Sequence, residues 1–216
     1  MDGRRLVSTR QYLFDVAWSP SGKHLAIRRS DGDGDNASDL VVVHLTDGHV
    51  VELGQAATAA TWSPDGTQFA YVTGSWPGLL VTVEPNGDVI HELDEIRTVN
   101  NDAAWSPDGR SIAYLQHSSG ILGTSIASVS PTGGDLRALT PRDGSLHSDP
   151  VWSPDSRRLV FSVLSGDASL YVVHTSGGRA QFVAAPGRLP AWSPDGRWLV
   201  FVGSGNDIYL ARPGRA

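Results

Sequence analysis

The segment AWSPDGRSIAYLQ, residues 104–116, decides the fold, because closely similar sequence occurs four more times in the chain. The other copies are AWSPSGKHLAIRR (17–29), TWSPDGTQFAYVT (61–73), VWSPDSRRLVFSV (151–163) and AWSPDGRWLVFVG (191–203). The tryptophans that they share, called marker tryptophans below, are Trp18, Trp62, Trp105, Trp152 and Trp192, at intervals of 44, 43, 47 and 40 residues. Units of about 40–50 residues with four short strands each are typical of β-propeller blades.

The strands of each unit can be located by their apolar residues and by the turns between them. A second strand is predicted directly after the motif, at 25–29, 69–73, 112–116, 159–163 and 199–203. A third strand and then a fourth follow, joined by turns such as TDGH and PNGD, whose Asp-Gly and Asn-Gly pairs favour tight hairpins. Because the second strand is apolar on both faces, both faces of each sheet are expected to be covered by neighbouring sheets.

The Ser-Pro-Asp-Gly element of the motif is typical of a turn in which glycine takes a positive φ. Ser156 stands where all four other copies have this glycine, so strain is predicted there if the residue takes a positive φ. The tryptophan before the turn is interpreted as a packing anchor.

The two ends of the chain are predicted to complete one blade together. After Trp192 the chain has a second and a third strand but no fourth, and it ends at Ala216. Residues 1–9 contain DGRRLVS, which resembles the missing turn and fourth strand. We therefore predict an all-β fold, with residues 1–216 forming a single five-bladed β-propeller of four-stranded antiparallel blades, closed by the N-terminal strand. The alternative is a five-repeat fragment of a larger propeller.

Composition restricts the classes of function. The net charge of −6 argues against a nucleic-acid footprint, and no apolar stretch is long enough for membrane insertion. The N-terminus lacks the apolar core of a signal peptide, which leaves the compartment open between a cytoplasmic chain and an exported chain whose signal was removed. The chain contains no cysteine, and no catalytic, phosphate-binding or dinucleotide-binding motif is visible. We expect a monomer.

The repeated motif resembles the TolB-like WSPDG-repeat β-propeller, and also the propeller domain of prolyl oligopeptidase-like peptidases. That resemblance covers nearly the whole chain. It implies a WD-repeat-like propeller scaffold for protein binding, and TolB proteins themselves are periplasmic. The catalytic domain of those peptidases has no counterpart in this sequence.

One group of candidate site residues follows from the symmetry of the repeats. Three residues before a marker tryptophan stand Asp15, Asp102 and Asp149, and equivalent positions in a propeller form a ring around its axis. These carboxylates could bind a metal, or they could cap backbone amides at the start of the innermost strand. The remaining candidates for this funnel come from the same class of loops or share its face, and they are Asn101, His147, Arg97, Arg188 and Trp76.

Other possible cofactor signals are weak. The loop DGDGDNASD, Asp31–Asp39, resembles the start of a calcium loop, but it has Asn36 and Val42 where such a loop needs glycine and an acid. A solvated acidic loop is the favoured interpretation, with no cofactor. The seven histidines are interpreted mainly as surface or edge residues.

Three functions remain open. The first is a non-catalytic scaffold that binds a protein partner or a ligand through its top-face loops and funnel. The second is a metal-dependent hydrolase or lyase that uses the axial carboxylates. The third is an accessory or sensor domain of a larger TolB-like or peptidase system.

Overall fold

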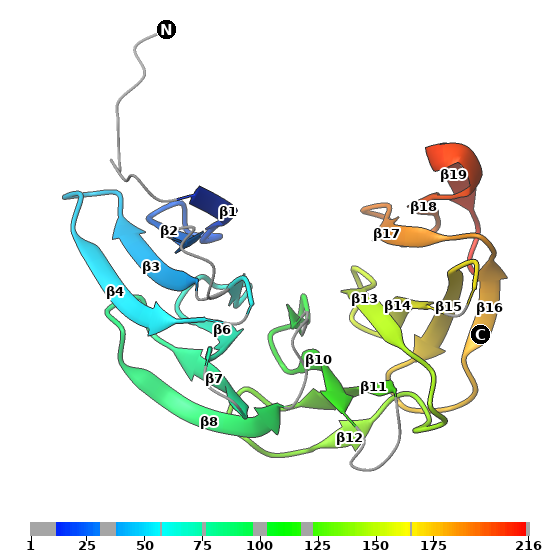
Figure 1. Ribbon diagram of the computed structural model, residues 1–216, viewed down its shortest axis with the longest axis horizontal. Coiled ribbons are helices and arrows are strands. Elements are labelled where there is room, and N and C mark those ends of the chain that lie inside the picture. The colour runs from blue at the N-terminus through cyan, green and yellow to red at the C-terminus, as the bar shows by residue number, and fades with distance from the viewer. Residues whose placement is uncertain are drawn as a thin grey trace, which may run out of the picture. The chain divides into compact units, whose positions relative to one another are not determined.

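The computed structural model describes residues 12–30, 38–56, 58–74, 77–96, 103–117, 123–164 and 166–214. These residues form antiparallel β-sheets, which confirms the all-β prediction (Figure 1). Contacts divide the chain into two compact units, residues 1–100 and 101–216, and each is described by itself.

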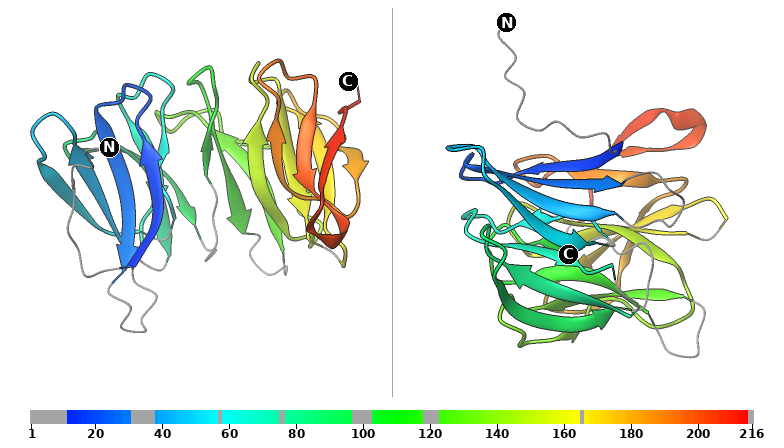
Figure 2. Two further views of the ribbon diagram at one scale, coloured as in Figure 1. Left: turned by 90° about the horizontal axis from the view of Figure 1, so that it is seen from above. Right: turned by 60° about the vertical axis from the view of Figure 1, so that its left-hand side comes forward.

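The first unit contains two four-stranded sheets, each in chain order. The strands of the first sheet are β1 (Tyr12–Trp18), β2 (His24–Ser30), β3 (Asp39–His44) and β4 (Val50–Gln55). Those of the second are β5 (Thr61–Trp62), β6 (Phe69–Val72), β7 (Gly78–Val83) and β8 (Val89–Ile96). Figure 2 shows the hairpins that connect successive strands within each sheet.

The second unit contains two four-stranded sheets and one sheet of three strands. The first has β9 (Ala104–Trp105), β10 (Ile112–His117), β11 (Thr124–Val129) and β12 (Arg137–Ala138). The second has β13 (His147–Trp152), β14 (Arg158–Val163), β15 (Ser169–His174) and β16 (Gln181–Ala184). The third has β17 (Arg188–Trp192), β18 (Leu199–Val202) and β19 (Ile208–Ala211), with a short 3-10 turn, η1 (Ser204–Asn206), before β19.

The strands lie where the repeats predicted them, to within about two residues at most ends. The main departure is the fourth strand of the third repeat, which is only two residues long at Arg137–Ala138. The predicted closing strand at residues 1–9 lies outside the described residues, so closure of the ring remains a prediction.

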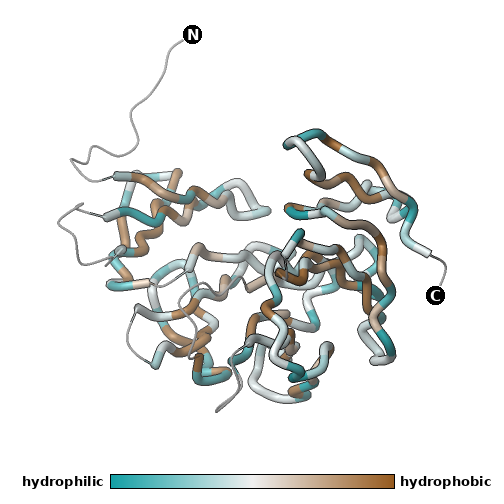
Figure 3. Tube along the Cα trace, turned by 45° about the vertical axis from the view of Figure 1, so that its right-hand side comes forward, coloured by the Kyte–Doolittle hydropathy of each residue, from teal (hydrophilic) through white to brown (hydrophobic). Residues whose placement is uncertain are grey.

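Within each unit, neighbouring sheets pack face to face, as the apolar second strands predicted. In the first unit, Ala26 and Val42 of one sheet contact the opposite face of the next, which carries Trp62, Phe69 and Tyr71. In the second unit, the corresponding cluster joins Ala113 and Ile126 to Trp152, Leu159 and Phe161. Figure 3 shows hydrophobic residues, in brown, gathered in stretches along the chain.

Within each unit, a marker tryptophan also forms a hydrogen bond across each junction between neighbouring sheets, called a joint below. The indole Nε1–H donates to the carbonyl that immediately precedes the previous marker, over 41 to 48 residues of sequence. The pairs are Trp62 with Ala17 O at 3.1 Å, Trp152 with Ala104 O at 2.8 Å, and Trp192 with Val151 O at 3.1 Å. The packing-anchor interpretation is thus confirmed for Trp62 and Trp152, which are 8% and 7% exposed, whereas Trp18 is 61% exposed.

The turn after each marker is stabilised by its own side chains. In the second repeat, Ser63 Oγ donates to Asp65 Oδ1 at 2.6 Å, and Asp65 Oδ1 also accepts from the backbone N–H of Thr67 at 3.0 Å. These hydrogen bonds, led by the one from Ser63, lower the pKa of Asp65. Gly66 has a φ of 70°, and Ser156 has a φ of 59° at the equivalent position, as predicted.

Candidate functional site

The position three residues before the marker tryptophan falls at a β-bulge. The register is interrupted between Leu13 and Asp15 in β1, between Ser148 and Val151 in β13, and between Arg188 and Ala191 in β17. A bulge re-aims the side chains beside it and often accompanies a functional site. The predicted ring position is therefore structurally distinct in each of these three strands.

Asp15 is engaged in an ion pair within its own sheet. It lies opposite Arg28 in the register, and its Oδ2 accepts from Arg28 Nε at 2.9 Å and from Nη2 at 2.8 Å. The guanidinium of Arg28 also lies over the ring of Phe14, 5.6 Å from its centre. The carboxylate therefore has a structural role that neither of the two interpretations from sequence included.

His147, one of the funnel candidates, starts β13 at the edge of its sheet, and at 5% exposure it is buried and not a surface histidine. Its Nδ1 lies 2.5 Å from Thr124 O, and its backbone N–H donates to Thr124 Oγ1 at 2.7 Å. The ring packs on Phe161, with centroids 5.4 Å apart. Burial lowers the pKa of His147, more than the hydrogen bond to Thr124 raises it.

Arg188 starts β17, and its Nη2 donates a hydrogen bond to Asn206 Oδ1 in η1. The next residue, Leu189, has a φ of 51° although it is not glycine, and its side chain is 62% exposed. A left-handed conformation of this kind stores backbone strain, which tends to occur at functional positions. Leu189 stands three residues before Trp192, the position at which three other repeats have an aspartate.

Two further exposed leucines lie on the loops at this same end of the sheets. Leu146 precedes β13 and Leu164 follows β14, and the backbone N–H of Leu164 donates to Leu146 O at 2.7 Å. These two residues and Leu189 are called the leucine cluster below. Leu146 and Leu164 were not among the candidates from the sequence. Each is a large apolar residue in an otherwise polar loop, which could have identified it.

The remaining candidates from the sequence are not placed. Trp76, Arg97, Asn101 and Asp102 lie outside the described residues, and so does 31–37 of the acidic loop. Asp149 is described only as part of strand β13. Convergence of the three carboxylates remains a prediction.

The described part of the chain contains neither a metal-binding group of side chains nor a membrane-spanning helix. No three His, Asp or Glu side chains there come together in a way that could hold a metal ion. Within the same residues, no helix has the length and apolar character needed to cross a bilayer.

Antiparallel sheets in sequence order, with a tryptophan hydrogen bond between neighbouring sheets within each unit, define a chain of the β-propeller class. The model of the TolB beta propeller domain matches residues 2–194. The chain belongs to this family.

The individual relatives have longer chains, and the solved structures among them share the fold. "Uncharacterized peptidase YuxL" of Bacillus subtilis is 28% identical over 154 residues, which are 68% of this chain and 21% of that protein. The crystal structure of TolB from Acinetobacter baumannii has a TM-score of 0.68 at 15% identity and covers 97% of this chain and 56% of its own. Oligogalacturonate lyase in complex with manganese has a TM-score of 0.65 at 17% identity, and the match covers 95% of this chain and 63% of the lyase chain. This chain therefore spans about a fifth of the curated relative and little more than half of the TolB structure.

Proposed function

We propose that this chain is a non-catalytic binding propeller, and that the loops at the His147 end of its sheets contact a protein partner. The leucine cluster carries the proposal. The backbones of Leu146 and Leu164 are hydrogen-bonded to each other, and Leu189 lies in β17, which contacts β13 of the neighbouring sheet. Exposed apolar side chains on loops held by a rigid sheet are suitable anchors for a protein partner.

The strain at Leu189 supports the same proposal. A leucine with a φ of 51° at a bulge costs stability, and its exposed side chain gains little from burial within the sheet. Contact with a partner would supply the missing burial. Arg188, held by Asn206, would add a positioned cation beside the apolar contact.

The metal-dependent hydrolase or lyase is the weaker alternative. Asp15, one of its three proposed ligands, accepts two short contacts from Arg28, and binding a metal would require it to give up both of them. The ring of His147 is likewise engaged, because its Nδ1 is hydrogen-bonded to Thr124 O. Likeness to a manganese-bound lyase at 17% identity extends to the fold alone. An accessory role in a larger peptidase system draws on the YuxL match and is compatible with partner binding.

We further propose that the five sheets close into a ring. In a closed ring, the Trp18 indole would donate to Ala191 O, as each of the three observed joints does with its own carbonyl. Closure would cover Phe14, Val16 and Trp18, which β1 leaves exposed. It would also cover Val200, Ile208 and Leu210, which the last sheet leaves exposed. A ring of this kind would hold the binding loops at one face.

Crosslinking of the intact chain to partners, followed by mass spectrometry, tests the binding proposal. The double variant Leu146→Asp, Leu164→Asp should lose the partner, because each aspartate would have to be desolvated at the contact. Val89→Asp is the matched control, since Val89 is also exposed but starts β8 at the opposite end of the strands. Equal capture by the double variant and wild type would overturn the proposal, as would a turnover activity lost in Asp15→Asn and Asp149→Asn.

A further inference from the structure

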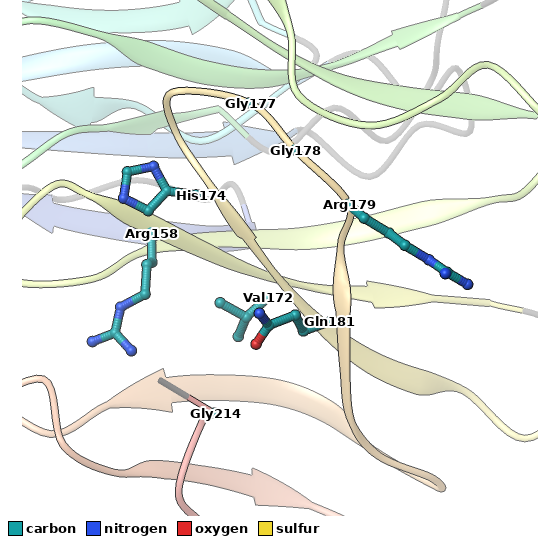
Figure 4. Close-up of a pocket in the computed structure, with 8 residues that line it drawn as sticks. All are labelled: Arg158, Val172, His174, Gly177, Gly178, Arg179, Gln181 and Gly214. Carbon is teal, nitrogen blue, oxygen red and sulfur yellow. The ribbon is translucent and has the colours of Figure 1, made fainter. Parts of the chain in front are cut away.

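A cavity of about 220 Å³ lies in the second unit, at the opposite end of the sheets from the leucine cluster. It is formed by the hairpin turn between β15 and β16 and by Gly214, after β19 (Figure 4). Two cross-strand pairs supply its walls: Arg158 faces His174 across the β14–β15 ladder, and Val172 faces Gln181 across the β15–β16 ladder. The side chains are thus positioned by regular sheet and not by a loop.

The polar lining of this cavity is cationic or neutral. Arg158, His174, Arg179 and Gln181 contribute, and no aspartate or glutamate lines it. Among the described residues, neither Arg158 nor Arg179 forms a salt bridge. The pKa of Asp155 is lowered chiefly by a hydrogen bond from Ser153 and to a lesser extent by the charge of Arg158, but Asp155 does not line the cavity. The guanidinium of Arg179 points away from the cavity in Figure 4 and contributes at long range only.

Arg158 is held in place without being neutralised. Its Nη2 donates to the backbone carbonyl of Gly196 at 2.9 Å, and its guanidinium carbon lies 4.6 Å from the ring centre of Trp192. A carbonyl and an aromatic face orient a guanidinium but leave its full charge. Arg158 is therefore a pre-positioned cation that can take an anionic oxygen through its remaining N–H groups.

The hydrogen bonds of His174 determine which ring nitrogen can donate. Its Nδ1 accepts from the Ser176 backbone N–H at 3.2 Å and lies 2.6 Å from Ser176 Oγ. A nitrogen that accepts a backbone N–H carries no proton, so the proton of the neutral ring is on Nε2. His174 thus offers a donor, as Arg158 does.

The turn keeps the cavity open. Gly177 and Gly178 have φ values of 101° and 125°, and a Cβ built on either would meet no atom within 4 Å. Opposite them, a Cβ on Gly214 would come within 3.1 Å of Gln181 Oε1. Glycine at 177 and 178 is favoured by the backbone of the turn, whereas a side chain at 214 would approach the wall at Gln181.

We propose that this cavity binds a small anionic group, a carboxylate or a phosphate, between Arg158, His174 and the amide of Gln181. A guanidinium matches the paired oxygens of either group, and the volume suits a group of that size. The site is separate from the leucine cluster, so it would act as a second contact point of the scaffold.

Nuclear magnetic resonance of the full chain tests this directly, with inorganic phosphate and succinate as separate probes. Saturable shifts of the Gly177 and Gly178 amides are expected with at least one probe, and which probe acts distinguishes phosphate from carboxylate. Arg158→Gln should weaken binding about tenfold or more, the effect of losing one charged hydrogen-bond partner.

Because Arg158 also packs on Trp192, a second variant is needed. Gln181→Glu keeps the shape of the wall and both cations but adds a carboxylate, and it should abolish the shifts. Arg157→Gln is the matched control, because Arg157 is exposed and does not line the cavity, and it should leave binding unchanged. Failure of both probes to produce saturable shifts in wild type would overturn the proposal, as would equal weakening by Arg157→Gln.

Discussion

At the scale of single residues, Leu189 combines a strained left-handed backbone with an exposed apolar side chain. Its side chain is 62% exposed, so burial in the sheet offsets little of the cost of a left-handed leucine, and contact with a partner would offset the rest. Leu189→Gly should raise the free energy of unfolding by about 1 kcal/mol, because glycine adopts this φ without steric cost. It should at the same time weaken partner capture.

Denaturant unfolding checks the stability change, and Leu189→Ala provides the control. Alanine keeps the strain and removes most of the side chain, so this variant should lose capture without gaining stability. A Leu189→Gly protein less stable than wild type would show that the conformation is not strained.

His147 predicts how stability depends on pH. Burial lowers its folded pKa below the ordinary value of 6.5, so the unfolded chain binds a proton at a pH where the folded chain does not. Its contribution is therefore complete above about pH 6.5 and is lost as the pH falls below that value. His24, whose pKa is also lowered, chiefly by burial and then by the nearby His44, adds to the same slope.

Unfolding measured across this range should show wild-type stability falling with acid and His147→Gln falling less. His117→Gln, which changes an exposed histidine, should retain the wild-type slope. Identical slopes for His147→Gln and wild type would rule out a neutral buried imidazole.

At the scale of elements, the joint between sheets depends on one indole hydrogen bond and the apolar face around it. Trp152→Phe keeps most of the apolar contact but leaves Ala104 O without its donor, and it should cost about 1–2 kcal/mol of unfolding free energy. Trp198→Phe is the control, because Trp198 belongs to no joint and its ring is covered by Arg212. A smaller loss for Trp152→Phe than for Trp198→Phe would refute the role of the marker.

The strands could be predicted because the same turn and the same apolar pattern recur in every repeat. Five copies of one turn and one apolar column locate the second strands, and the glycine position identifies Ser156 as strained. The site is different, because it depends on register. Asp15 meets Arg28 only because the bulge in β1 sets them opposite each other, 13 residues apart. The burial of His147 depends on Thr124 from another sheet, and the strain at Leu189 arises at a bulge that no local motif marks.

At the scale of the whole molecule, the repeats and the TolB beta propeller domain match establish the family, and ring closure is the step that remains to be tested. Closure would place the five sets of loops around one axis, which both the predicted funnel and the binding face require. Trp18 tests closure, because only in a closed ring would its indole donate to Ala191 O of the last sheet.

Hydrogen exchange of the five marker indole N–H groups, resolved by nuclear magnetic resonance, measures closure most directly. The closed five-bladed ring predicts that the Trp18 indole exchanges as slowly as those of Trp62, Trp152 and Trp192, which donate to backbone carbonyls. Exchange of the Trp18 indole N–H at the rate of a free tryptophan side chain, while those of Trp62, Trp152 and Trp192 are protected, would contradict closure of the ring.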